Sequence, residues 1–318
     1  MSTELKQLAP KRVVIGADKH AILAEMLRTA RPDLEVRGNV VANISLADLE
    51  WGDTYFGFRR PRVSSMGNIR WVHSTGAGVD PWLYPTEIPN DILLTRSSES
   101  FGPMIAEWAL SRALAFTQQV VPLAESQKQQ KWAPREIEML SGTKAVVVGI
   151  GDVGVHCARL FRALGCSVIG VSRSGKSADS VFDNVVPVAQ VAQAVQGADW
   201  LILMLPLTAE TRHVINRDVL QNCKNAILIN AGRGAVVDES AIPEALDSGW
   251  LRGAALDVFE TEPLPATSPL WLDKRVIVSP HISGITTTKG AISGFLECLN
   301  DFENGRSSRW VVDRSRQY

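Results

Sequence analysis

Residues 145–174, AVVVGIGDVGVHCARLFRALGCSVIGVSRS, carry the strongest fold signal in the chain. The run from Ala145 to Val148 is apolar and rich in β-branched residues, as in a parallel strand covered on both faces. Three glycines at G-x-G-x-x-G spacing then open a stretch whose apolar residues recur at helical intervals. Residues 167–171 read as a second strand, so the stretch predicts a strand, a tight turn, a helix and a neighbouring strand.

Each glycine has a role in such a turn. Gly149 permits the tight turn, Gly151 lets a pyrophosphate approach the backbone, and Gly154 lets the helix pack closely on the strand. Amides at the helix start would point at the phosphates. An ordinary glycine-rich turn is the alternative, whereas a P-loop is disfavoured because Val155 and His156 stand where Lys and Ser/Thr are needed. The sequence therefore predicts dinucleotide binding.

The end of the second strand bears on the choice of cofactor. NAD sites usually place Asp or Glu there to bind the ribose 2′-hydroxyl, whereas this chain has Ser172, Arg173 and Ser174, with no carboxylate before Asp179. A guanidinium flanked by hydroxyls suits a 2′-phosphate, which a carboxylate would repel. We expect NADP(H), with NAD(H) as the second option; a solvated loop arginine is the alternative reading of Arg173.

Length and composition limit the class of protein. With 318 residues, 45% of them hydrophobic, the chain can form two medium domains. The formal net charge is -1 and no basic block is present, which argues against a nucleic-acid partner and favours small ligands. The start lacks an apolar leader segment, and no apolar run approaches the ~18 residues needed to cross a bilayer. We expect a cytoplasmic protein without membrane contact.

The cysteines are widely spaced in apolar segments and form no C-x-x-C pair, which predicts buried thiols in a reducing compartment and no metal site. They are Cys157, Cys166, Cys223 and Cys298.

The chain before the glycine turn contains a separate unit. Residues 13–97 alternate short apolar runs with a helical pattern, which predicts a small α/β unit. Its STGAGVD turn at 74–80 either offers amides to an anion or is a plain turn. A helix is predicted from residue 98 to about 117. Its apolar residues lie on nearly all sides of the helix, so it must be buried on several sides. The polar segment QKQQKWAPRE at 127–136 is interpreted as a linker.

The chain after residue 174 alternates strands with helices, which predicts a doubly wound parallel sheet. The expected strands lie at 200–208 and 226–234 and within 253–265 and 275–284, and the expected helices lie near 211–222 and 239–248. A last helix over 290–300 could fold back onto the first unit.

Three polar residues follow predicted strands at the edge where open α/β sheets bind ligands. Arg233 could grip an anionic substrate with bidentate hydrogen bonds, and His281 could exchange a proton near neutrality. Glu262, if hydrogen-bonded to the other ring nitrogen, would favour the imidazolium. Taken singly, each residue also fits a role outside catalysis and binding: a solvated loop arginine, an exposed glutamate and a structural histidine.

Together these segments resemble the D-isomer-specific 2-hydroxyacid dehydrogenases over almost the whole chain. The resemblance rests on STGAGVD, IAEWAL, VVVGIGDVG, ADWLILMLPLTAETRHVIN, AILINAGRGAVVDESAIPEAL, GAALDVFETEPLP and SPHISG. It implies an α/β protein with two doubly wound parallel-sheet domains, Rossmann-like and flavodoxin-like, and an interdomain active-site cleft. Residues 1–98 and 286–318 would form the substrate-binding domain, and residues 99–285 the dinucleotide-binding domain.

The resemblance also implies residue roles. Arg233, Glu262 and His281 would be the catalytic set, with Arg233 and His281 also touching substrate and the amides of Ala77 and Gly78 holding its carboxylate. The implied cofactor-binding residues are Gly149, Gly151, Asp152, Val153, Gly154, Ser172, Arg173, Ser174, Leu205, Pro206, Ala231 and Asp257. Family members are usually homodimers joined through the cofactor domain, so a homodimer is expected.

One departure from the sequence pattern of the NAD-using family members narrows the expected activity. Ser172 stands where NAD-using members have Asp, a pattern similar to the NADPH-preferring glyoxylate/hydroxypyruvate reductases. We expect reduction of a small 2-keto acid to the D-2-hydroxy acid. Arg59 and Arg60 could add a cation near the substrate or be surface arginines. Two alternatives remain: an NAD-dependent dehydrogenase of a larger or phosphorylated hydroxy acid, and a nicotinamide-sensing interaction protein on the same fold.

Overall fold

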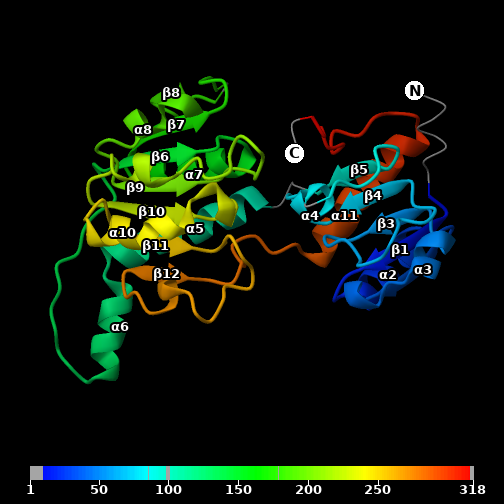
Figure 1. The fold of residues 1–318 in the computed structure, drawn as a ribbon, viewed down its shortest axis with the longest axis horizontal. Coiled ribbons are helices and arrows are strands. Elements are labelled where there is room, and N and C mark those ends of the chain that lie inside the picture. The colour runs from blue at the N-terminus through cyan, green and yellow to red at the C-terminus, as the bar shows by residue number, and fades with distance from the viewer. Residues whose placement is uncertain (1–9, 85, 98–100, 178, 316–318) are drawn as a thin grey trace. The chain divides into compact units, whose positions relative to one another are not determined.

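The chain folds into two compact units, seen in Figure 1. The structure is a computed structural model that describes residues 10–84, 86–97, 101–177 and 179–315. Unit 1 combines Met1–Ser100 with Thr286–Tyr318, and unit 2 is Phe101–Ile285. Each unit has its own parallel sheet, which confirms the predicted α/β class with two parallel-sheet domains.

Unit 1 is built on a five-stranded parallel sheet of order β2-β1-β3-β4-β5. Its strands are β1 (Arg12–Gly16), β2 (Glu35–Asn39), β3 (Thr54–Phe56), β4 (Trp71–Ser74) and β5 (Leu93–Arg96). Its helices are α2 (His20–Ala30), the short 3-10 turn η1 (Val41–Asn43), α3 (Leu46–Trp51), α4 (Asp80–Leu83) and α11 (Thr288–Glu303). This strand order is that of flavodoxin-like doubly wound folds.

Alternating side chains of the unit 1 strands serve two cores. Val13 and Ile15 face a cluster with α2 and α11, whereas Val14 faces the cluster that includes α3 and α4. The last helix therefore returns to the first unit, as the sequence suggested, and packs Phe295 flat on Trp71 with ring centroids 4.8 Å apart. Burial on both faces explains why residues 13–15 of β1 read as an unbroken apolar run.

Unit 2 is built on a seven-stranded parallel sheet of order β12-β11-β10-β9-β6-β7-β8. Its strands are β6 (Lys144–Val148), β7 (Ser167–Ser172), β8 (Asn184–Pro187), β9 (Trp200–Leu203), β10 (Ala226–Asn230), β11 (Leu251–Leu256) and β12 (Val276–Val278). Its α-helices are α5 (Phe101–Thr117), α6 (Val120–Lys128), α7 (Asp152–Ala163), α8 (Val191–Ala194), α9 (Arg217–Leu220) and α10 (Ile242–Asp247). Short 3-10 turns are η2 (Val188–Gln190), η3 (Gly234–Val236), η4 (Glu239–Ala241) and η5 (Pro269–Trp271). The strand order reverses between β6 and β9, and such a switch point is where doubly wound sheets bind ligands.

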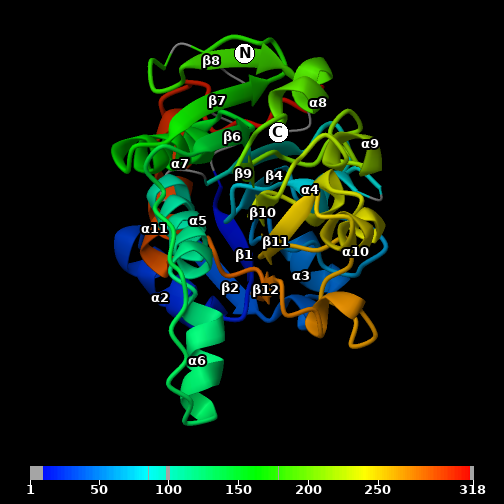
Figure 2. The ribbon, with the colours of Figure 1, turned by 90° about the vertical axis from the view of Figure 1, so that its left-hand side faces the viewer.

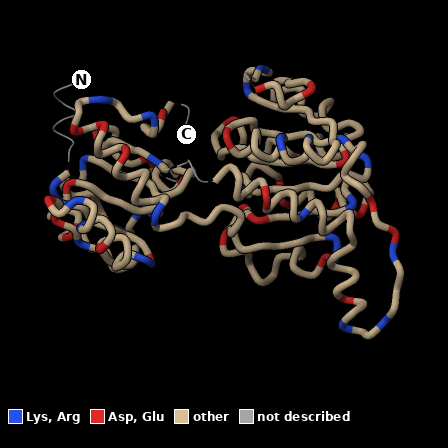
Figure 3. Tube along the Cα trace, turned by 180° about the vertical axis from the view of Figure 1, so that it is seen from behind, with Lys and Arg blue, Asp and Glu red and all other residues tan. Residues whose placement is uncertain are grey.

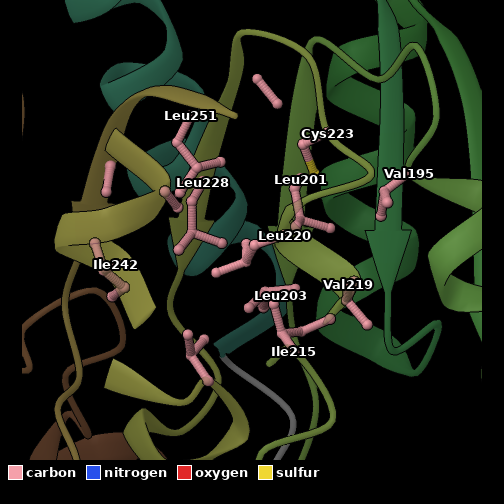
Figure 4. Close-up of a cluster of buried hydrophobic side chains, with 14 of the residues drawn as sticks. Val195, Leu201, Leu203, Ile215, Val219, Leu220, Cys223, Leu228, Ile242 and Leu251 are labelled. Atoms are coloured by element: carbon pink, nitrogen blue, oxygen red, sulfur yellow. The ribbon is translucent and has the colours of Figure 1, made fainter. Parts of the chain in front are cut away.

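Helices cover both faces of the unit 2 sheet. Figure 2 shows α5 and α7 on one face and α8, α9 and α10 on the other. Figure 4 shows the core under the second group, where Leu201, Leu203 and Leu228 of the sheet meet Leu220 and Ile242 of the helices. These five side chains are 0 to 1% exposed, so the sheet that carries the loops of interest is a rigid support.

Several elements differ from the sequence-based expectations. β9 ends at Leu203 instead of 208, and the helix expected over 211–222 is only the four residues of α9. β2, β8 and α6 were not anticipated. The edge strand β2 (EVRGN) is largely polar, and the edge strand β8 (NVVP) is only four residues long. The long helix begins at Phe101 within the described residues; its expected first residues, 98–100, lie outside them.

Charged residues of both signs are mixed along the described chain, and Figure 3 shows them interspersed along both units. Among the residues that the structure describes, no helix has the length and apolarity to span a bilayer, and no cluster of His, Cys, Asp and Glu could hold a metal ion. All four cysteines are free and buried, which confirms the predicted burial of the thiols.

Candidate active site

The glycine turn between β6 and α7 has the backbone that its sequence requires. Gly149 has a φ of 93°, and a Cβ there would lie 2.6 Å from the Met204 carbonyl oxygen. A Cβ on Gly154 would lie 1.9 Å from the Gly149 carbonyl oxygen, so α7 sits directly on the turn. Both positions exclude any larger residue for reasons internal to the protein.

Gly151 differs from these two glycines. Its φ of -71° suits any residue, and a Cβ there would meet nothing within 4 Å. Gly151 is also the N-cap of α7, where no side chain accepts a hydrogen bond from the first turn. The helix start therefore offers backbone amides and open space together, which fits the pyrophosphate of a dinucleotide.

The next two positions complete the turn. The Asp152 side chain lies against α5, since a Cβ built on Gly102 would be 2.5 Å from Asp152 Oδ2. Its carboxylate is 3.5 Å from His156 Nδ1, and Val153 packs on the apolar core beneath α7. At Asp152, the group suited to a phosphate is therefore the backbone amide, with the carboxylate turned toward α5.

The end of β7 is free of acidic side chains that could compete for a phosphate-binding arginine. Ser172 Oγ donates a hydrogen bond to the Lys176 carbonyl oxygen at 3.3 Å. Asp179, the nearest carboxylate in sequence, is paired with Arg159 Nη2 at 2.6 Å. Arg173 is exposed and makes no ion pair or hydrogen bond with another residue of the described ranges, and the adjacent Ser174 is exposed too.

The loops after β9 and β10 pack on each other near the switch point. A Cβ on Gly232 would lie 2.8 Å from the Leu205 carbonyl oxygen, so the two loops are in backbone contact. Pro206 is exposed, while Leu205 is half-buried and Ala231 is 7% exposed. All three lie at the carboxyl edge of the sheet, next to the glycine turn through Met204.

Arg233 follows β10 on a loop that Asn230 stabilises. The Asn230 side chain is 1% exposed; its Oδ1 accepts from the Gly232 amide at 3.1 Å and its Nδ2 donates to the Arg233 carbonyl at 3.1 Å. Arg233 Nη1 donates to the Gly232 carbonyl at 2.8 Å, and the residue is half-buried. The guanidinium is thus held close to its own loop.

Glu262 and His281 are brought together from the ends of β11 and β12. His281 Nδ1 lies 2.7 Å from Glu262 Oε2, and the side chains are 39% and 35% exposed respectively. The other Glu262 oxygen accepts from the Phe259 amide at 3.1 Å. Because Nδ1 faces the carboxylate, Nε2 is the ring nitrogen left to face a ligand.

Arg233 belongs to the same site as this pair. A Cβ on Gly234 would lie 1.9 Å from the Phe259 carbonyl carbon, so the loops carrying Arg233 and Glu262 are in close contact. Burial alone would raise the pKa of Glu262, but the hydrogen bond and charge of His281, the Phe259 amide and the charge of Arg233 outweigh it, and the pKa is lowered. Glu262 is therefore a carboxylate held ionised beside His281 and Arg233.

Asp257, at the end of β11, organises the loop that carries His281. It is 0% exposed; Oδ1 accepts from Ser279 Oγ and the Ile282 amide, and Oδ2 accepts from the Ser283 amide at 2.7 Å. The Asp257 carbonyl accepts from the His281 amide at 2.8 Å. Within the described residues, the hydrogen bonds of the Asp257 carboxylate go to the 279–283 segment. The cofactor contact expected of it stays a prediction.

The STGAGVD turn follows β4 in unit 1. Ala77 and Gly78 are half-buried, and their amides donate to no residue of the described chain. Arg59 and Arg60 lie on another loop of this unit, where the Arg59 carbonyl accepts from the Tyr55 hydroxyl and Arg60 Nη1 donates to the Thr86 carbonyl at 2.8 Å. Arg60 therefore has a structural partner in its own unit.

Sequence reasoning missed the support given by Asn230 and assigned Asp257 only to the cofactor. Asn230 ends the apolar strand AILIN, and Asp257 directly follows the largely apolar strand LRGAAL. That position was the available signal, because a buried polar residue at a strand end must find partners in the adjoining loops.

The family model described as "D-isomer specific 2-hydroxyacid dehydrogenase, NAD binding domain" matches residues 110–283. The chain belongs to the D-isomer-specific 2-hydroxyacid dehydrogenase family. The protein is accordingly an oxidoreductase of the 2-hydroxyacid dehydrogenase class that uses a nicotinamide cofactor.

Curated relatives of this dehydrogenase include glyoxylate/hydroxypyruvate reductase A. The protein of that name from Serratia proteamaculans is 33% identical over 258 residues, which cover 79% of this chain and 82% of the relative. The one from Salmonella paratyphi B is 33% identical over 303 residues, which cover 92% and 94%.

Solved structures of this family share the fold over nearly the whole chain. One is the NADPH-dependent glyoxylate/hydroxypyruvate reductase from Sinorhizobium meliloti in complex with NADP and sulfate, with a TM-score of 0.83, 26% identity and coverage of 97% and 100%. Another is a D-isomer specific 2-hydroxyacid dehydrogenase from Xanthobacter autotrophicus in complex with NADPH and MES, with a TM-score of 0.82, 28% identity and coverage of 98% and 100%.

Proposed function

We propose that this dehydrogenase reduces a small 2-keto acid of the glyoxylate or hydroxypyruvate class to the D-2-hydroxy acid, with NADPH as reductant. The observation that carries the proposal is the Glu262 and His281 pair, 2.7 Å apart, with the loop that carries Glu262 in contact with the Arg233 loop. A carboxylate-oriented imidazole beside a guanidinium is the set of groups that carbonyl reduction of an anionic substrate requires.

His281 is the proton donor in this mechanism. The contact of Nδ1 with ionised Glu262 orients the ring and leaves Nε2–H to face the substrate. The reduced nicotinamide, when bound, supplies the hydride that goes to the carbonyl carbon. As negative charge develops on the carbonyl oxygen, His281 Nε2 transfers its proton to that oxygen and becomes neutral, and the product alcohol is complete.

Arg233 binds the substrate in this mechanism. Its guanidinium is always charged and has several N–H donors, so it can bind the substrate carboxylate and the carbonyl oxygen beside it. The Ala77 and Gly78 amides of unit 1 would bind the same carboxylate. Since both partners recognise a carboxylate next to the reacting carbonyl, a 2-keto acid is favoured over a simple aldehyde.

The glycine turn and the end of β7 would hold the cofactor. Gly151 and the first amides of α7 would take the pyrophosphate, and Leu205, Pro206 and Ala231 would line the rest of the site. Arg173, flanked by Ser172 and Ser174, would take the 2′-phosphate. The absence of a carboxylate at the end of β7 and the pairing of Asp179 with Arg159 support NADPH over NADH.

Small substrates are supported by the names of the relatives, which are glyoxylate/hydroxypyruvate reductases. A panel of glyoxylate, hydroxypyruvate and longer 2-keto acids, run with NADPH and NADH in parallel, tests both parts of the proposal. We expect the highest kcat/KM for the small acids with NADPH. Preference for a bulky or phosphorylated acid with NADH would overturn the substrate and cofactor assignments, and inactivity with every acid would overturn the activity.

A matched pair of variants tests the cofactor assignment alone. Arg173→Ala should raise the KM for NADPH at least tenfold and leave that for NADH nearly unchanged, because only NADPH carries the 2′-phosphate. Arg70→Ala, an exposed arginine just before β4 in unit 1, is the control for loss of a surface arginine. Equal losses with both cofactors would contradict recognition of the 2′-phosphate by Arg173.

We also infer that the enzyme is a homodimer in the cytoplasm. Exposed apolar residues gather on α6 and the segment after it: Val120, Val121, Leu123, Trp132, Ile137 and Met139, which are 40 to 97% exposed. Such a patch is costly in a monomer and suits a second copy of the chain. The four free buried thiols fit a reducing compartment. Light scattering during gel filtration would give the mass of the assembly.

A further inference from the structure

The turn after β4 is held by side chains that bind its carbonyls. The Thr75 carbonyl accepts from Thr286 Oγ1 at 3.2 Å, the Ala77 carbonyl from Arg96 Nη1 at 2.9 Å, and the Gly78 carbonyl from Ser74 Oγ at 3.2 Å. The donors come from β4, β5 and the residues just before α11. Three carbonyls of one short turn are thus fixed within unit 1.

Arg96 is placed for this contact by the sheet. It is the last residue of β5 and lies opposite Ser74, the last residue of β4, in the parallel register. The Ser97 amide donates to the Ser74 carbonyl at 3.0 Å, and the Arg96 amide donates to the Trp310 carbonyl at 3.1 Å. The backbone on both sides of Arg96 is therefore anchored, and its half-buried side chain reaches from a rigid strand end to the turn.

Fixing a carbonyl also fixes the amide on the other side of the same peptide bond. In a planar trans peptide the C=O and N–H point in opposite directions. The guanidinium that binds the Ala77 carbonyl therefore turns the Gly78 N–H away from Arg96. A permanent positive charge on the carbonyl also polarises the peptide and makes that N–H a stronger donor.

We propose that Arg96 is a positioning residue for substrate binding, because its contact with the Ala77 carbonyl orients and polarises the Gly78 amide that receives the substrate carboxylate. This inference rests on the proposed function. Arg96 is then a cation of unit 1 that acts on the substrate through the peptide bond between Ala77 and Gly78. Arg233, in contrast, binds the substrate directly. The specificity for a carboxylate thus depends on a residue behind the turn.

Arg96→Met tests the proposal, because it keeps an unbranched apolar stem and removes the donor and the charge. We expect the KM for glyoxylate to rise about tenfold or more, the usual effect of losing a hydrogen bond from a charged donor. The Ki of oxamate, a carboxylate-bearing analogue, should rise in parallel. The KM for NADPH and the kcat at saturating glyoxylate should stay within about twofold of the unaltered enzyme, since the cofactor turn and His281 belong to unit 2, whereas Arg96 and the Ala77 carbonyl belong to unit 1.

Arg28→Met is the matched control, because Arg28 Nη2 also donates to a backbone carbonyl of unit 1, that of Val36, at 2.7 Å. Arg96→Lys, which keeps the charge and a donor, should recover part of the lost affinity and provides a second variant if Arg96→Met folds poorly. A merely structural role would lower kcat and the melting temperature and leave the glyoxylate KM of the folded enzyme unchanged.

The outcomes separate the two claims. If the unaltered enzyme turns over glyoxylate and both Arg96 variants keep its KM and the oxamate Ki, the positioning role is overturned and the proposed function stands. If the unaltered enzyme reduces no 2-keto acid, the proposed function is overturned, and the role of Arg96 is overturned with it. A rise in both constants in Arg96→Met, with neither change in Arg28→Met, supports the inference.

Discussion

Glu262 and His281 show how two half-exposed side chains form a defined pair. Glu262 accepts from the Phe259 amide with one oxygen and faces His281 with the other, so the carboxylate is fixed at both ends. His281 has a φ of 53°, an uncommon backbone for a residue other than glycine, and its amide donates to the Asp257 and Ser279 carbonyls. The ring position is therefore set by the backbone of the loop as well as by Glu262.

Glu262→Gln should change the pH dependence of the reaction. The pKa of Glu262 is lowered from its ordinary 4.5, so the group is ionised at neutral pH and loses its charge only as the pH falls through that lowered value. The amide cannot stabilise the imidazolium by charge at any pH. We expect turnover at neutral pH to fall about tenfold or more, and the decline of reductase activity with rising pH to begin at lower pH.

The pH profile of kcat/KM for glyoxylate checks this expectation. Glu239→Gln is a useful control, because Glu239 is another partly buried carboxylate of unit 2, which accepts from the Glu260 amide at 3.1 Å. A profile for Glu262→Gln that coincides with that of the unaltered enzyme would show that the carboxylate does not act on the proton donor.

At the scale of elements, the sequence predicted the site better than it predicted the boundaries. Apolar β-branched runs identified β1, β6 and β10, and the glycine spacing identified the start of α7. Arg233, Glu262 and His281 could be grouped because parallel strands end at one edge of a sheet. Their mutual orientation could not be predicted, because it depends on the loop contacts made by Asn230 and Asp257. β2 and β8 were missed because edge strands need little apolar patterning.

The two glycines of the α7 turn should respond differently to alanine. Gly154→Ala places a Cβ 1.9 Å from the Gly149 carbonyl oxygen, so the helix must shift; we expect a loss of roughly 1–3 kcal/mol of stability. Gly151→Ala meets no protein atom within 4 Å and should cost at most about 1 kcal/mol. It should nevertheless weaken NADPH binding at least tenfold, because the methyl group would occupy the space assigned to the pyrophosphate.

Thermal unfolding and calorimetric titration with NADPH separate these two effects. The Gly151→Ala variant provides the internal control, since its binding loss is expected without a matching loss of fold. NADPH affinity equal to that of the unaltered protein in Gly151→Ala would argue that the phosphates bind elsewhere.

For the whole molecule, each unit has its own source of stability. In unit 1, His73 lies on β4 with 0% exposure; its Nδ1 meets Thr95 Oγ1 and its Nε2 meets Ser97 Oγ, both at 2.8 Å. Trp71 Nε1 donates to the same Thr95 hydroxyl, and Phe295 of α11 packs on both rings. A buried polar network of this kind ties the sheet to the helix that returns from the end of the chain.

This histidine should make the stability of the protein depend on pH. Burial lowers the pKa of His73 from its ordinary 6.5 to about 3. Below pH 6.5 the unfolded chain takes up a proton at this position and the folded chain does not, until the pH nears 3. The free energy of unfolding should therefore fall as the pH drops through this window, by about 1.4 kcal/mol per pH unit from this group.

Denaturant unfolding at pH 7, 6 and 5 measures that slope, and His73→Gln isolates the contribution of the histidine. The variant will be less stable at pH 7, but its stability should decline less steeply as the pH falls. Parallel curves for the two proteins would contradict the assignment of a neutral buried imidazole.

The central claim, that His281 protonates a 2-keto acid during reduction by NADPH, is tested most directly by the turnover of His281→Ala. The account predicts that the unaltered enzyme oxidises NADPH in the presence of glyoxylate or hydroxypyruvate. In the variant, kcat should fall by about a hundredfold or more while calorimetry shows unchanged NADPH binding. Undiminished turnover in His281→Ala would contradict the account.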